Sequence, residues 1–143
     1  MDGNDEMWGH IESLFGSITH EFRSVFIGGF EERSFTAGER VLTEGTVSDT
    51  LFLVRAGELR VFLETSGETI QLSTLKPGSF FGEVSLLDPG PASAHVEGVL
   101  DGSLLGISNQ HLLNLYETSP KNIAPLMRNL ATHLAHNLRR SSQ

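Results

Sequence analysis

The chain has 143 residues, which is enough for one domain with its own hydrophobic core. It contains no cysteine, which excludes disulfides, thiolate metal sites, iron–sulfur clusters and a cysteine nucleophile. A formal net charge of -8 argues against nucleic acid or an anionic membrane as partner of the whole surface. No apolar run reaches the about 20 residues of a membrane span, and the acidic N-terminus is unlike a signal peptide. These features favour a soluble, cytoplasmic protein.

Residues 1–33 are predicted to form two helices. The first follows candidate N-caps at Asn4 and Asp5, and its apolar residues recur at steps of three and four: Trp8, Ile11, Leu14, Phe15 and Ile18. A second, shorter helix is expected from Thr19, with an apolar face of Phe22, Val25 and Phe26. The Gly28–Gly29 pair should end it.

Residues 34–108 have the pattern of a β structure. Short apolar runs such as "TLFLV", "LRVFLE", "TIQLSTL", "HVEGVL" and "SLLGI" are separated by "AGE", "EGT", "SGE", "KPG", "DPGP" and "DGS". Turn signals every eight to twelve residues indicate a sandwich or barrel. We predict an antiparallel β-roll, or jelly roll, of about eight strands.

Residues 109–143 are predicted to be helical again. One helix should end at Pro120, and the next should begin near Asn122 or bend at Pro125. The last helix carries an apolar stripe of Ile123, Leu126, Leu130, Leu134 and Leu138. This stripe favours a homodimer interface, and packing back onto its own chain is the alternative. The whole chain is therefore predicted to be a single α+β domain, 1–143.

Three stretches carry a family resemblance: "FTAGERVLTEG" at 35–45, "DTLFLVRAGELRV" at 49–61 and "LKPGSFFGEVSLL" at 75–87. With the trailing helices, they resemble a cyclic-nucleotide-binding domain, as in catabolite-activator-type regulators and cyclic-nucleotide-dependent kinases and channels. The resemblance implies that ribose and phosphate contacts come from Gly82, Glu83, Val84 and Ser85. It also makes His133 and Asn137 of the last helix candidates for the base side of a ligand.

The resemblance fails at one position. The family places an arginine nine or ten residues after the glutamate, followed by small residues, whereas this chain has Ala92, Ser93 and Ala94. Losing a bidentate arginine–phosphate contact in a desolvated site costs about 2–5 kcal/mol, or a factor of about 30 to 4000 in affinity. Ordinary cyclic-nucleotide affinity is therefore not expected.

Other residues near this segment offer no clear substitute for the arginine. His95 should point to the strand face opposite Ala92, and Asp88 adds negative charge. The sequence leaves open whether Arg55, Arg60 or Lys76 reaches the site.

We therefore expect a non-catalytic regulatory module of this fold, with a degenerate pocket and no cofactor, that acts through an unidentified protein partner. Two alternatives remain: a functional receptor for cyclic mono- or dinucleotides, and the sensor half of a transcription regulator. Without a recognition helix, this chain alone is not expected to bind DNA. No metal site is expected, because His133 and His136 have no carboxylate near them on the helix and His95 is the roll's single histidine.

Overall fold

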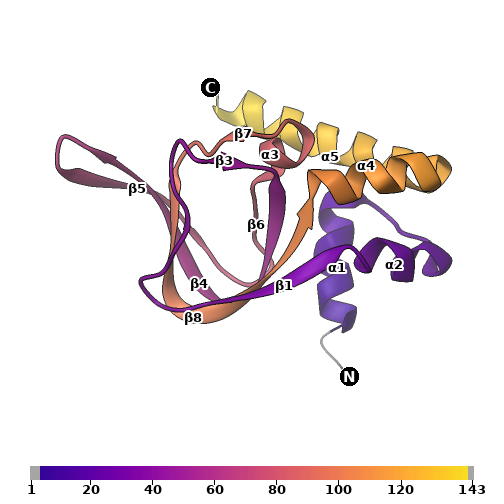
Figure 1. The fold of residues 1–143 in the computed structure, drawn as a ribbon, viewed down its shortest axis with the longest axis horizontal. Helices are drawn as coiled ribbons and strands as arrows, with labels where there is room; N and C mark the ends of the chain where they lie inside the picture. Colours follow the sequence, from indigo (N-terminus) through magenta and orange to yellow (C-terminus); the bar gives the residue numbers. More distant parts are fainter. Residues whose placement is uncertain (1–3, 142–143) are drawn as a thin grey trace. The chain divides into compact units, whose positions relative to one another are not determined.

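A computed structural model describes residues 4–141 (Figure 1). Its described residues fall into two compact units. The β unit is Glu31–Asn109, and the helical unit combines the residues up to Phe30 with those from Gln110 onward. No described helix has both the length and the apolar character needed to cross a membrane. The single domain over 1–143, with its parts 1–33, 34–108 and 109–143, stays a prediction.

The β unit contains eight described strands and one short helix. They are β1 (Phe30–Phe35), β2 (Arg40–Leu42), β3 (Val47–Ser48), β4 (Thr50–Thr65), β5 (Glu68–Leu75), β6 (Phe80–Phe81), α3 (Glu83–Leu87), β7 (Gly90–Pro91) and β8 (His95–Ser108). The main sheet has the order β1-β8-β4-β5, with β2 on β8 and β6 on β4, and β3 pairs with β7. The antiparallel pairing of β4 with β5, β6 and β8 confirms the predicted roll.

Two of the expected turns are instead bulges inside long strands. The sequence pattern separates the apolar runs at "AGE" 56–58 and at "DGS" 101–103, but β4 and β8 continue through them side by side (Figure 1). Ala56 pairs with Ser103 there, and the register shifts on both sides of Ala56. A Cβ on Gly102 would lie 1.9 Å from the carbonyl oxygen of Ala56, so only glycine permits this close approach.

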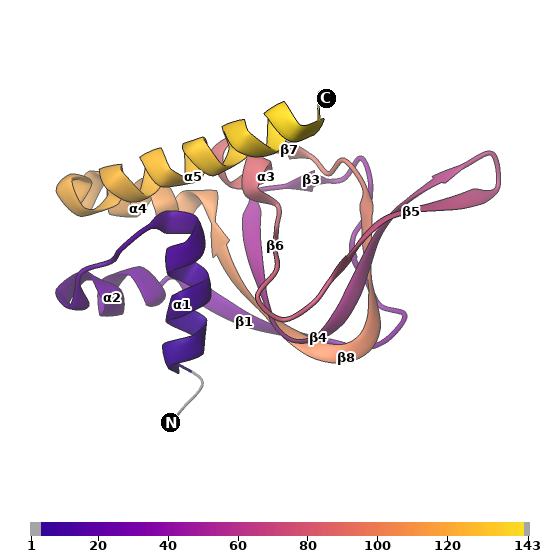
Figure 2. The ribbon, with the colours of Figure 1, turned by 180° about the vertical axis from the view of Figure 1, so that it is seen from behind.

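The core of the β unit lies between these strands. Apolar side chains from the long strands and their neighbours form one buried cluster of Phe35, Val41, Phe52, Val54, Leu59, Leu75, Phe81, Val96 and Leu104. The distal part of β4 and most of β5 form a hairpin that extends away from the rest of the roll (Figure 2). The cluster includes Leu59 of β4 and its β5 partner Leu75, so the core reaches the base of this hairpin.

The helical unit contains α1 (Asn4–Phe15), α2 (His20–Ile27) and α5 (Pro120–Ser141), and α4 (Asn109–Thr118) begins at its boundary. Thr19 caps α2 by accepting from the Phe22 N–H. Asn129 of α5 donates to the Phe15 carbonyl at 2.9 Å, so α5 caps the end of α1. The predicted helices are present.

The start of the last helix differs from the prediction. α5 begins at Pro120 rather than near Asn122, and it continues through Pro125. Proline suits the first helical position, because its fixed φ is helical and its missing N–H would have no partner there. Pro125 removes one intrahelical bond, the one to the Lys121 carbonyl, close to the helix start.

The leucine stripe of α5 divides into two halves. Ile123, Leu126 and Leu130 are buried within this single chain, where α5 packs against α1. Leu134 is half-buried, and Leu138 is 69% exposed. Burial of Ile123, Leu126 and Leu130 within the chain agrees with the alternative, in which the stripe packs back onto its own chain. The homodimer through the stripe stays a prediction, and Leu134 and Leu138 are its more exposed members.

Candidate functional site

The β unit contains a cavity of about 370 Å³. It is walled by α3, the β7 region and residues of β2, β4, β6 and β8. Seven of the candidate ligand-binding residues line it: Gly82, Glu83, Val84, Ser85, Ala92, Ser93 and Ala94. The structure thus brings together two segments that are separated in the sequence.

Gly82 positions one wall of the cavity. It has a left-handed φ of 86° and joins β6 to the first turn of α3. A Cβ at this position would lie 2.4 Å from the Thr50 carbonyl oxygen, so a side chain would collide with β4. The Leu86 N–H bonds to the Gly82 carbonyl at 3.2 Å, and helix geometry leaves the preceding N–H groups without an intrahelical partner.

Ala92 positions the opposite wall. Its N–H donates to the Thr46 carbonyl and its carbonyl accepts from the Gly45 N–H, both at 2.9 Å. With its backbone held on both sides, Ala92 lines the cavity and is only 8% exposed. A small apolar side chain therefore occupies the position where the family resemblance calls for an arginine.

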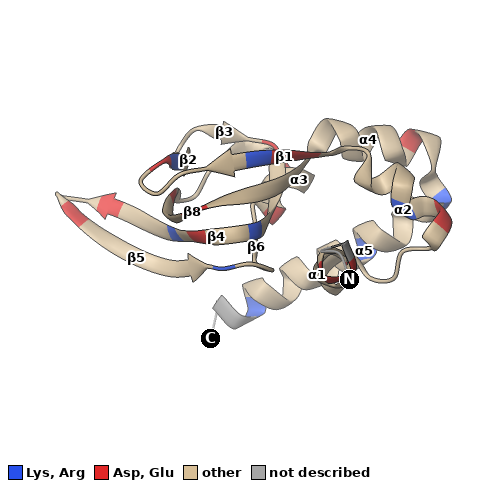
Figure 3. Cartoon of the chain, turned by 90° about the horizontal axis from the view of Figure 1, so that it is seen from below, with Lys and Arg blue, Asp and Glu red and all other residues tan. Residues whose placement is uncertain are grey.

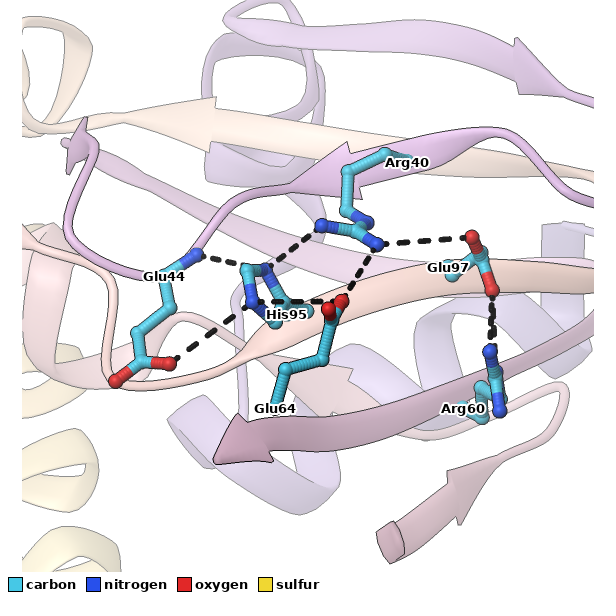
Figure 4. Close-up of polar contacts among 6 residues, drawn as sticks. All are labelled: Arg40, Glu44, Arg60, Glu64, His95 and Glu97. Carbon is cyan, nitrogen blue, oxygen red and sulfur yellow. Dashed lines mark hydrogen bonds and ion pairs between the residues drawn. The ribbon is translucent and has the colours of Figure 1, made fainter. Parts of the chain in front are cut away.

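His95 belongs to a polar cluster outside the cavity (Figure 4). Its Nδ1 accepts from the Glu44 backbone N–H at 3.1 Å and lies 3.0 Å from an Arg40 guanidinium nitrogen. Because both partners are donors, Nε2 carries the proton of the neutral ring. Arg40 also donates to Glu64 at 3.1 Å. The cluster ties the turn after β2 to the start of β8, next to the Ala92–Ala94 wall.

The basic residues that could replace the missing arginine do not line the cavity. Arg60 donates twice to Glu97, at 2.7 and 3.1 Å, within the same polar cluster (Figure 4). Arg55 forms an ion pair with Glu32 at 3.6 Å. Neither arginine, nor Lys76, is among the described residues that line the cavity. Figure 3 shows basic residues on strands of the β unit but none on α3.

The charged groups that do line the cavity are acidic. Burial raises the pKa of Glu83, and a hydrogen bond with its own backbone N–H partly offsets that rise. Asp88, at the end of α3, is the second lining carboxylate. The described lining residues include these two acids and no Lys, Arg or His.

Glu83→Gln should raise stability at neutral pH. Because the folded-state pKa of Glu83 lies above the ordinary 4.5, the contribution of this carboxyl to stability is greatest while it is protonated and is lost as the pH rises through that pKa. The glutamine removes this loss, so the free energy of unfolding at neutral pH should rise. We expect a rise below about 1 kcal/mol, because solvent screens a partly exposed carboxyl. Thermal melts should coincide below about pH 4 and separate above it. A variant that is less stable at neutral pH would contradict this.

Several lining residues were not predicted from the sequence. They are Leu42, Val61, Phe81, Gly90, Pro91 and Val96. Strand alternation offered a signal for Val96, since it lies two residues after Ala94. No such signal exists in the sequence for the others, because their place in the lining depends on which strands pair and in what register, and neither is a local property of the sequence.

The proposed base-side residues His133 and Asn137 lie on α5 in the helical unit, where both are half-buried. Their role stays a prediction. Among the described residues there is no group of three or more His, Cys, Asp or Glu that could hold a metal ion.

Comparison with known proteins identifies the family. The family described as "Cyclic nucleotide-binding domain" matches residues 32–119. The chain belongs to this family. This cyclic nucleotide-binding domain is 33% identical to the Cyclic AMP receptor protein of Thermus thermophilus over 127 residues, which are 88% of this chain and 57% of that protein.

Two further relatives cover different shares of the domain. A cAMP-dependent protein kinase regulatory subunit of Emericella nidulans is 32% identical over 83 residues, 58% of this chain and 20% of that protein. A cyclic nucleotide-binding domain from Methylobacillus flagellatus shares the fold with a TM-score of 0.84 at 23% identity, covering 96% of this chain and 79% of that one. The chain thus spans just over half of the Thermus protein and a fifth of the kinase subunit.

Proposed function

We propose that this domain is a non-catalytic regulatory module whose pocket binds cyclic nucleotides weakly and whose output is a protein contact. The observation that carries the proposal is the placement of Ala92 in a cavity whose described lining has two carboxyls and no cation. A buried phosphate needs a paired cation, because taking an unpaired charge out of water costs several kcal/mol.

The regulatory role is supported by the family and by the names of its members. One matched relative is called a receptor protein and another a kinase regulatory subunit. Both are longer than the region they share with this chain, so in each of them the matched domain is one part of a larger protein. For this chain we propose an unidentified protein partner and a homodimer through Leu134 and Leu138 of α5.

A second candidate is a functional receptor for cyclic AMP. It is favoured by the 33% identity to the Thermus protein and by the intact Gly82–Ser85 segment. In this case another contact would replace the charge of the arginine.

Calorimetric titration of the wild-type protein separates the two candidates. Cyclic AMP, cyclic GMP and cyclic di-GMP should each bind about 30- to 4000-fold more weakly than they bind a site that keeps the arginine contact. Saturable micromolar binding of any of the three would contradict the proposal and establish the receptor.

A further inference from the structure

The cavity is a formed site even without a phosphate-binding cation. Its volume of about 370 Å³ lies near the lower end of the about 300–1,000 Å³ typical of small-molecule sites. Much of the wall is apolar, including Leu42, Val61, Phe81 and Val96. Such a surface, with a few polar groups set into it, is what organic ligands bind.

The polar groups of the cavity are arranged along α3 and the wall opposite it. Glu83 begins α3, Asp88 follows its last residue, and the hydroxyl-bearing Ser85 and Ser93 also line the space. Carboxylates accept hydrogen bonds, and hydroxyls can both donate and accept. The lining side chains therefore offer mostly acceptors, with negative charge.

We propose that this cavity binds a small organic ligand that is cationic or uncharged, with an apolar body and an amine or hydroxyl donor that meets Glu83. The inference rests on the proposed function, since it requires that the site is not primarily a phosphate site.

The charge of the lining carries the selectivity. An ammonium group near Glu83 and Asp88 gains attraction from both carboxylates, whereas a phosphate is repelled by both. A hydroxyl donates to either carboxylate without a desolvation cost as large as that of an ion. Burial destabilises the ionised form of Glu83 and so raises its pKa. A cationic ligand beside this carboxylate would stabilise the ionised form.

The backbone N–H groups of α3 do not reverse this preference. α3 has only five residues, so few aligned peptide dipoles add to the charge of its first turn. A cationic side chain such as arginine would have to supply the remaining positive charge that a phosphate needs. The described lining contains no such side chain.

Three probes with one apolar body test the selectivity: benzylamine, benzyl alcohol and benzyl phosphate. Titrations of the wild-type protein are followed through the methyl resonances of Ala92 and Ala94, which line the cavity. We expect the affinity for benzylamine to exceed that for benzyl phosphate by a factor of about ten or more, with the affinity for benzyl alcohol between them. Equal or tighter binding of benzyl phosphate overturns the inference, as does a failure of benzylamine and benzyl alcohol to shift these methyls.

Charge-removing variants locate the origin of the preference. Glu83→Gln should reduce the ratio of benzylamine to benzyl alcohol affinity severalfold, and Asp88→Asn should reduce it less, because Asp88 is more exposed. Glu68→Gln is the matched control, since Glu68 is an exposed residue of β5 that does not line the cavity, and the ratio should not change. A ratio that Glu83→Gln leaves intact also overturns the inference.

The outcome is distinguishable from failure of the proposed function. Micromolar binding of cyclic AMP by the wild type contradicts the proposed function whatever the benzyl probes do. Weak cyclic AMP binding together with a preference for benzyl phosphate contradicts only the ligand class inferred here.

Discussion

Ala92→Arg should bind cyclic AMP about 30- to 4000-fold more tightly than the wild-type protein. The substitution adds a bidentate donor to a wall whose backbone is already held by Thr46 and Gly45. Opposite this wall, the cavity already contains the Gly82–Ser85 segment. Calorimetry measures the gain directly, and ligand-dependent rises in melting temperature give an independent estimate.

Ala92→Gln is the matched control for this gain. Glutamine is long and polar but uncharged, and it cannot form a charge-assisted fork with a phosphate. We expect it to leave cyclic AMP binding near the wild-type level. If the wild type already binds at micromolar concentration and Ala92→Arg adds nothing, the pocket is not degenerate and another group meets the phosphate.

Leu130→Asp should abolish stable folding of the helical unit. Leu130 is 0% exposed on α5, so the substitution removes a core leucine and buries an unpaired carboxylate. Removing the leucine alone costs about 2–5 kcal/mol, a large part of the about 5–15 kcal/mol that stabilises a typical domain. Urea or thermal denaturation followed by circular dichroism measures the loss. A Leu130→Asp protein with a wild-type melt would show that α5 does not bury this side chain.

Leu138→Asp is the matched control and also tests the dimer. Because Leu138 is 69% exposed, its replacement should change stability by no more than about 0.5 kcal/mol. If Leu134 and Leu138 join two subunits, the variant should be monomeric in light scattering while the wild type is dimeric. Equal masses for the two proteins would contradict a dimer through this half of the stripe.

The sequence alone determined the element types and the defect in the site. Turn glycines, apolar runs and the return of helical periodicity are local features, so they predicted the roll and the flanking helices. The spacing from Glu83 to Ala92 is likewise a count along the chain, and it showed that the expected arginine is absent.

Only the tertiary structure decided which surface each residue faces. The "AGE" and "DGS" segments have turn composition, but pairing between β4 and β8 makes them bulges of continuous strands. Periodicity shows that Leu130 and Leu138 share a stripe, yet packing of α5 against α1 buries the first and leaves the second exposed. Arg60 is engaged with Glu97 outside the cavity because strand register directs it there. Burial and register depend on contacts between distant segments, which a local sequence pattern does not contain.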